Sequence, residues 1–149
     1  MRSRIVTRLF GALVLLASAA PLIAHHAFGA EFDREAPVKL QGKIVKLEWV
    51  KPHTWLHVEV VKDGATEVWA VEGGTPNVLL RRGLRRDCLV PGTVIIVDGY
   101  QAKDHSLKRA NGRDVTFSDG TKIFLGSSGT GAPYDADVAR PREAAAGRC

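Results

Sequence analysis

The sequence predicts an all-β fold with one short helix, and three observations predict it. Apolar side chains recur at every second position in several short stretches between residues 38 and 125, which is typical of β-strands. The alternation changes phase near Ile44-Val45, which indicates a bulge or a sharp bend in a long first strand. The expected order is three strands, a short helix and two or three further strands. This order favours a small five- to six-stranded OB-like barrel, and another small barrel or an open sandwich is the main alternative.

The first two predicted strands lie on either side of Lys51-Pro52. The first covers residues 38–49, where Gly42 makes bending easier. The second covers residues 54–61, and its alternate residues divide into a core face and a partly exposed face. The core face consists of Leu56, Val58 and Val60, and the partly exposed face of Trp55, His57 and Glu59.

A hairpin and the helix come next. Asp63-Gly64 suits the primed turns that match the twist of paired strands, and the third strand is predicted over residues 66–72. Gly73-Gly74 then leads into Thr75-Pro76, a helix cap followed by a proline suited to the first turn. The short helix stops at Gly83.

The second half of the domain is predicted from turn signals and shorter apolar runs. Strands are expected over residues 93–100, 113–117 and 121–125, with a polar loop over residues 102–112. Residues 127–149 are rich in Gly, Ala, Pro and Arg and lack apolar periodicity, so they are predicted to be a disordered tail.

Residues 1–24 are predicted to be a signal peptide. Three arginines precede an apolar run from Leu9 to Ala19, and small residues follow it. The run is too short to span a bilayer. Cleavage after Ala24 leaves His25 as the first residue of the mature chain, and cleavage after Ala19 is the alternative. The mature chain is therefore expected to be periplasmic or secreted, with no stable membrane span.

The mature chain is divided into three parts. Residues 25–37 form an N-terminal arm that Phe28 and Phe32 can fix by packing back on the domain, and residues 38–126 form the barrel. The predicted tail completes the chain.

Charge and cysteine content narrow the functional classes. Of the 21 basic side chains, three lie in the predicted signal peptide, so the mature chain has 18 against 16 acidic ones, a net charge of +2. This small excess does not indicate a nucleic-acid partner. Cys88 and Cys149 would meet an oxidising compartment, but the sequence leaves open whether they pair.

Several side chains are candidates for binding a ligand. Trp55 and His57 share the partly exposed face of the second strand, and Gly73-Gly74 could offer backbone N–H groups to an anion. Arg81 and Arg82 belong to a basic patch at the helix end, which is equally typical of a solvated face. An aromatic platform of the kind that binds sugars or nucleotides is also conceivable, although the core interpretation is favoured for its members, Trp49, Trp55, Trp69 and Tyr100.

Histidines suggest a metal site of copper or zinc. The free amine and ring of an N-terminal His25 can chelate a metal, and a further imidazole from His26, His53 or His57 could complete the site. Residues four apart on one strand are about 13 Å apart, so His53 and His57 cannot share a metal without a break in the strand. The alternative is that His25 and His26 are a plain leader and His57 hydrogen-bonds on the sheet face.

The sequence contains no complete catalytic motif. It has no Gly-x-Ser-x-Gly, no His-Glu-x-x-His and no Cys-x-x-Cys, and no acid–base pair can be named. An enzyme with an unidentified site stays an alternative to a binding protein.

The chain resembles a family of short exported bacterial proteins of unknown function. The motifs that carry the resemblance are His25-His26-Ala27-Phe28, Trp49-Val50-Lys51-Pro52-His53, Glu72-Gly73-Gly74-Thr75-Pro76-Asn77, Arg81-Arg82-Gly83 and Leu89-Val90-Pro91-Gly92. In that family serine usually stands at the place of Ala27 and asparagine at the place of Lys51. The resemblance extends from His25 to about Leu125 and implies an exported barrel domain with no assigned activity, and its histidines motivate the metal hypothesis.

Together these observations predict an exported OB-like domain that acts as a binding or accessory protein for a small molecule or another exported protein. The expected ligand face includes His53, Trp55, His57 and the Gly73-Gly74 loop.

Overall fold

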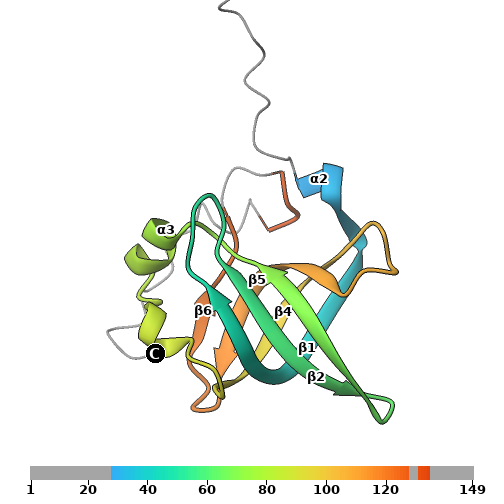
Figure 1. The fold of residues 1–149 in the computed structure, drawn as a ribbon. Coiled ribbons are helices and arrows are strands. Elements are labelled where there is room, and N and C mark those ends of the chain that lie inside the picture. The colour runs from blue at the N-terminus through green and yellow to red at the C-terminus, as the bar shows by residue number, and fades with distance from the viewer. Residues whose placement is uncertain (1–27, 128–130, 135–149) are drawn as a thin grey trace, which may run out of the picture.

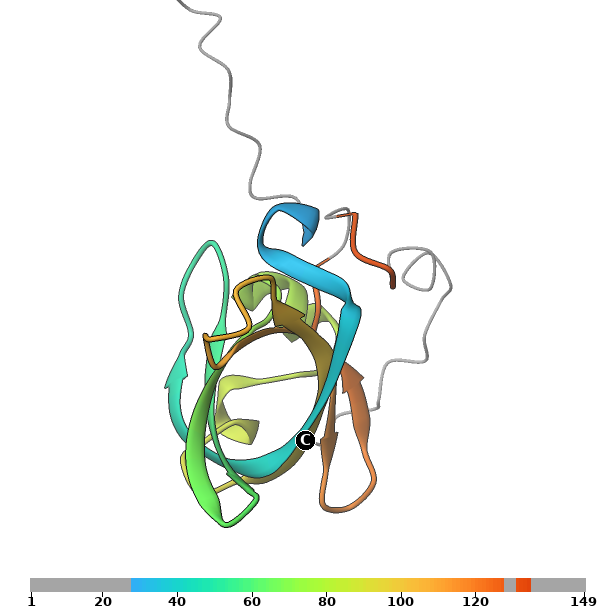
Figure 2. The same cartoon turned by 90° about the vertical axis from the view of Figure 1, so that its right-hand side faces the viewer.

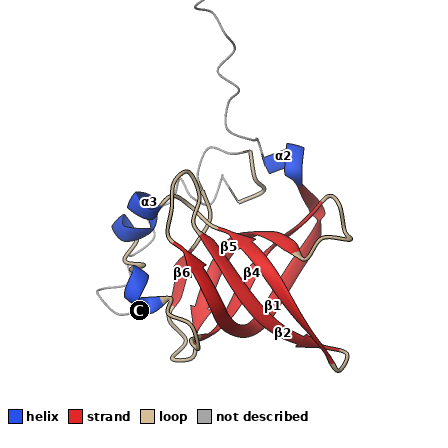
Figure 3. Cartoon of the chain, viewed as in Figure 1, coloured by secondary structure: helices blue, strands red, loops and turns tan. Residues whose placement is uncertain are grey.

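The structure of the chain is a computed structural model, which describes residues 28–127 and 131–134. Six strands form one sheet, accompanied by two short α-helices and a single turn of 3₁₀-helix, so the described part is mostly β (Figures 1 and 3). In chain order the elements are α2 (Phe28–Glu31), β1 (Phe32–Glu48), β2 (Trp55–Lys62), β3 (Ala65–Glu72), α3 (Pro76–Arg81), η1 (Arg86–Cys88), β4 (Val94–Ala102), β5 (Arg109–Phe117) and β6 (Lys122–Phe124).

The sheet curls until its two sides meet. Antiparallel neighbours run in the order β3-β2-β1-β4-β5-β6, and a short parallel pairing of β3 with β5 closes five of the strands into a ring (Figure 2). The closing contact covers the pairs Ala70↔Arg109, Val71↔Ala110 and Glu72↔Asn111. The predicted all-β fold is confirmed, and α3 lies between β3 and β4, as the expected OB-like order requires.

The long first strand serves both halves of the ring. Its pairing with β4 extends as far as Lys43, and its pairing with β2 begins at Gly42. The register with β2 shifts between Ile44 and Lys46, which confirms the predicted bulge. A Cβ atom at Gly42 would lie 2.0 Å from the carbonyl oxygen of Glu59, so only glycine lets the two backbones approach this closely.

The interior of the ring holds the main hydrophobic core. Alternate residues of β2 are buried as predicted, with Leu56, Val58 and Val60 inside. Trp69 of β3 is also part of this core.

Aromatic side chains form a second cluster at one end of the ring, which we call the aromatic cap. Phe28 of α2 meets Tyr100 edge-on with ring centroids 5.4 Å apart, so the expected packing of the N-terminal arm on the domain is confirmed. Residues 131–134 lie within the predicted tail, yet Tyr134 is fully buried against this cluster. The members of the aromatic cap are Phe28, Phe32, Tyr100, Ala102, Phe124, Ala132 and Tyr134.

Local signals around α3 act as predicted. The hydroxyl oxygen of Thr75 accepts a hydrogen bond from the Val78 N–H, Pro76 opens the helix, and Gly83 follows with a φ of +86°.

Three features differ most from the prediction. Helix α2 was not expected, β1 begins at Phe32 instead of residue 38, and β5 begins at Arg109 instead of residue 113. The added part of β5 is polar and shows no alternation, and it is a strand because β3 and β4 pair with it on both sides.

No helix among the described residues is long and apolar enough to cross a membrane. The predicted signal peptide, His25, His26 and Cys149 lie outside the described residues, so the cleavage site stays a prediction. Cys88, whose pairing the sequence leaves open, is disulfide-bonded.

Candidate functional site

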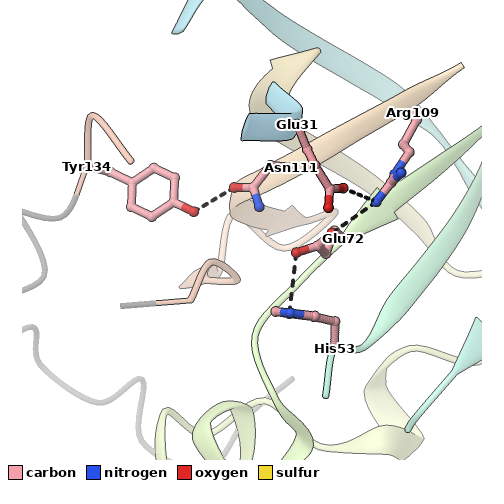
Figure 4. Close-up of polar contacts among 6 residues, drawn as sticks. All are labelled: Glu31, His53, Glu72, Arg109, Asn111 and Tyr134. Carbon is pink, nitrogen blue, oxygen red and sulfur yellow. Dashed lines mark hydrogen bonds and ion pairs between the residues drawn. The ribbon is translucent and has the colours of Figure 1, made fainter. Parts of the chain in front are cut away.

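Four polar side chains from separate parts of the chain meet at the end of the ring that α2 covers (Figure 4). Arg109 Nη2 lies 2.6 Å from Glu31 Oε2 and 3.5 Å from Glu72 Oε2. On the other side of the same carboxylate, His53 Nδ1 lies 3.3 Å from Glu72 Oε1. We call Glu31, His53, Glu72 and Arg109, together with the neighbouring Trp55, the Glu72 cluster.

The strand register explains why these residues meet. Trp55 at the start of β2 lies directly opposite Glu72 at the end of β3. Two residues earlier in β3, Ala70 lies opposite Arg109, because β5 runs parallel to β3 here. Glu31 ends α2 just before β1, and so enters from the N-terminal arm.

Trp55 is the aromatic member of the cluster. The guanidinium carbon of Arg109 lies 4.9 Å from the centre of its ring and 5.5 Å from that of Phe32, a cation–π arrangement that favours the charged arginine. The predicted outward direction of Trp55 is confirmed, since the buried residues of β2 are the alternate ones.

Glu72 has unusual electrostatics. Only 8% of the residue is exposed, and burial raises the pKa of its carboxyl group, with Glu31 adding to the rise, while His53 and Arg109 oppose it. When both glutamates are ionised, the cluster has two negative charges against the one of Arg109. A buried carboxyl group with a raised pKa is a feature common among functional sites.

The buried Nδ1 atom of His53 is the second notable polar atom of the cluster. It is buried, and it makes no hydrogen bond of good geometry to any described residue, although Glu72 is within ion-pair distance. Buried polar atoms normally have a hydrogen-bond partner, and the Glu72 carboxylate is the group within reach of this one.

A buried hydrogen bond supports the cluster from the side of the tail. The hydroxyl group of Tyr134 donates to Asn111 Oδ1 over 2.5 Å, and Asn111 is paired with Glu72 in the parallel ladder. Asn111 is therefore held by Tyr134 through its side chain and by β3 through its backbone pairing with Glu72.

A family model matches residues 12–111, and the family it describes is DUF6152, a family of unknown function. The chain belongs to DUF6152. All five residues of the Glu72 cluster lie inside the matched segment, whereas Tyr134 lies outside it. The resemblance to a family of unknown function is confirmed. No curated protein and no solved structure matches the chain.

The second histidine of the predicted ligand face lies apart from the cluster in this DUF6152 chain. His57 Nε2 is 2.8 Å from Glu48 Oε1 on the outer face of β1 and β2, so His53 and His57 contact different carboxylates. Among the described residues no group of three or more His, Cys, Asp or Glu side chains could hold a metal ion. The other two predicted metal ligands, His25 and His26, lie outside the described residues.

The predicted anion site at Gly73-Gly74 is not available. The Gly73 N–H donates to the Thr54 carbonyl over 2.8 Å and the Gly74 N–H to the Leu125 carbonyl over 2.7 Å. A Cβ at Gly73 would also lie 2.9 Å from the Leu125 side chain. These glycines therefore allow close packing of the backbone and do not bind an anion.

The arginines of the predicted basic patch have different surroundings and do not share one ligand site. Arg82 donates a hydrogen bond to the Gly126 carbonyl and lies over the Phe124 ring at 4.4 Å, so it is used in packing. Arg85 pairs with Asp87 at 3.0 Å, and Arg81 is exposed.

The aromatic side chains do not form one platform either. Trp69 lies in the main core, Trp49 packs against that core, and Tyr100 packs against the aromatic cap, which leaves Trp55 alone at the cluster. Glu31, Glu72 and Arg109 are not among the predicted site residues, so only His53 and Trp55 of the cluster are predicted from the sequence. The alternation of side chains along β5 could have placed Arg109 on the outer face. The sequence does not show that this strand begins at Arg109.

Proposed function

We propose that this DUF6152 protein is an exported binding protein that holds a small polar ligand at the Glu72 cluster. The observation that carries the proposal is a nearly buried carboxyl group with a raised pKa, placed between an arginine and a histidine and next to Trp55. Few, precisely placed polar groups beside an aromatic side chain are typical of small-molecule sites.

The charge of the cluster indicates the kind of ligand. With both glutamates ionised it has one excess negative charge, and Arg109 is already engaged by Glu31. A carboxylate or phosphate ligand would meet like charge, whereas an ammonium group or neutral hydroxyl groups would find two carboxylates and His53 as acceptors. We therefore propose an organic amine or a neutral polyhydroxylated molecule as the ligand.

Export is the second part of the proposal. It is supported by the arginines before the apolar run at residues 9–19 and by small residues after that run, which together are typical of a cleaved signal.

A thermal-unfolding screen tests the ligand class. The purified mature protein is heated with a panel of small amines, sugars and carboxylic acids. We expect stabilisation by members of the first two classes, of about 1.4 kcal/mol at ten times the Kd, which corresponds to several degrees. Glu72→Gln should lose the shift, and Glu35→Gln, at an exposed position of β1, should keep it.

Stabilisation by carboxylic acids alone, or equal shifts in wild type and Glu72→Gln, would contradict the proposed site.

A copper or zinc protein is the second candidate. One observation favours it: α2 begins three residues after His25 and carries Glu31 into the Glu72 cluster, beside His53. After cleavage at Ala24 the terminal amine and ring of His25 would form part of the site.

Intact mass and metal content of the exported chain test this candidate. It requires a chain that begins at His25 and holds one copper or zinc ion, and we expect His53→Ala to weaken the binding while His105→Ala does not. A chain that stays metal-free after addition of either ion would discard the metal function and leave the proposal of an organic ligand intact.

A further inference from the structure

A groove on the outer face of the ring lies where β1, β4 and β5 run side by side and β6 flanks them. Its volume is about 410 Å³, which is enough for a small molecule. It is lined by Pro37, Val38, Lys39, Asp98, Gly99, Tyr100, Arg113 and Lys122. None of these residues belongs to the Glu72 cluster.

Strand pairing places the charges of the groove in one row. Lys39 of β1 lies opposite Asp98 of β4, and Asp98 lies opposite Asp114 of β5. Lys122 of β6 reaches this row from the other side, with its Nζ 3.5 Å from Asp98 Oδ2.

A buried carboxylate fixes two of the cations. Only 3% of Asp114 is exposed, and its Oδ2 lies 3.3 Å from Arg113 Nε and 3.4 Å from Lys122 Nζ. Because Asp114 holds both side chains from within the sheet, little further conformational entropy has to be lost when a ligand binds them.

Among the described residues, cations outnumber carboxylates at the groove. Its three cations, Lys39, Arg113 and Lys122, face the two carboxylates of Asp98 and Asp114. The Lys39 ammonium makes no ion pair with any described residue, although its side chain starts opposite Asp98. A concave surface that holds such an ammonium group beside two further cations is suited to an oxyanion.

We propose that this groove binds a small oxyanion, a carboxylate or phosphate group, through Lys39, Arg113 and Lys122. The guanidinium and the two ammonium groups act as charge-assisted donors, and Tyr100 forms one wall of the site. The site is separate from the ligand site of the proposed function and does not depend on it.

Amide chemical-shift mapping of the mature protein tests the proposal, with inorganic phosphate and acetate as the two probes. The titration is done at about 20 mM ionic strength, where screening between exposed charges is weak. We expect saturable shifts centred on residues 37–39, 98–100, 113 and 122. Saturation by phosphate alone identifies a phosphate group as the natural ligand class, and saturation by both probes includes carboxylates.

Matched lysine variants decide whether the groove is responsible. Lys39→Gln breaks no ion pair among the described residues, and it should weaken the binding about two- to fivefold, the range of an exposed charge pair. Lys51→Gln, at an exposed position beyond the other end of β1, should change nothing. Shifts that do not saturate with either probe, or an affinity that Lys39→Gln leaves unchanged, would overturn the proposal.

Discussion

At Glu72 burial favours the neutral carboxyl group, whereas the neighbouring His53 and Arg109 favour the carboxylate. The pKa is raised, so burial prevails. Between the ordinary pKa of 4.5 and the raised value, the folded chain holds more protons than the unfolded chain. The contribution of Glu72 to the free energy of unfolding therefore falls as pH rises through this window.

This balance predicts the behaviour of Glu72→Gln. The amide cannot ionise, so the variant should gain stability relative to wild type as pH rises from 4 towards 8, and it should be at least as stable at neutral pH. Urea unfolding of both proteins across this range measures the difference. A variant that becomes less stable relative to wild type with rising pH would show that Arg109 and His53 outweigh burial.

Gly42 is a residue whose role is purely steric. A methyl group there would meet the backbone of Glu59 at 2.0 Å, and neither strand can withdraw without breaking the ladder. We expect Gly42→Ala to cost about 1–3 kcal/mol or more of unfolding free energy. Gly29 in α2 has open space at the same position, so Gly29→Ala should be neutral or stabilise by up to about 1 kcal/mol. Equal effects of the two substitutions on unfolding would contradict the described register.

At the scale of elements, the sequence contained the information for β1, β2 and α3. The phase change at Ile44-Val45, the alternation after Trp55 and the Thr75-Pro76 cap each act locally, so a short window is enough to recognise them. The start of β5 could not be recognised in this way. Its polar residues form a strand only because β3 and β4 come together around them, which is a long-range effect. Arg109 was missed for this reason.

The segment of residues 131–134 acts as a strap over the aromatic cap. Tyr134→Phe keeps the ring and removes the hydroxyl group that bonds Asn111, which leaves a buried acceptor unpaired. The expected cost is about 1–3 kcal/mol, and Tyr134→Ala should cost more because it also leaves a cavity. Equilibrium unfolding in urea measures both. An unchanged free energy of unfolding in Tyr134→Phe would show that the hydrogen bond to Asn111 does not stabilise the folded protein.

At the scale of the whole molecule, closure of the ring and formation of the Glu72 cluster depend on the same strand contact. The short parallel contact of β3 with β5 closes the ring and also brings Glu72 to Arg109, so the fold and the candidate site depend on the same three residue pairs. With both glutamates ionised, the carboxylates of the Glu72 cluster outnumber its one guanidinium group, whereas three cations line the groove of β1, β4 and β5. Two ligands of opposite charge can therefore be held at different places on one small domain.

The central claim is that a cationic or neutral polar ligand binds at Glu72. Amide chemical-shift mapping with the amine or sugar that stabilises the protein most tests it directly. The account predicts that the largest shifts surround His53, Trp55, Glu72 and Arg109, and that Glu72→Gln weakens the affinity at least about tenfold, or 1.4 kcal/mol. Shifts centred elsewhere on the ring, with the same affinity in Glu72→Gln, would contradict it.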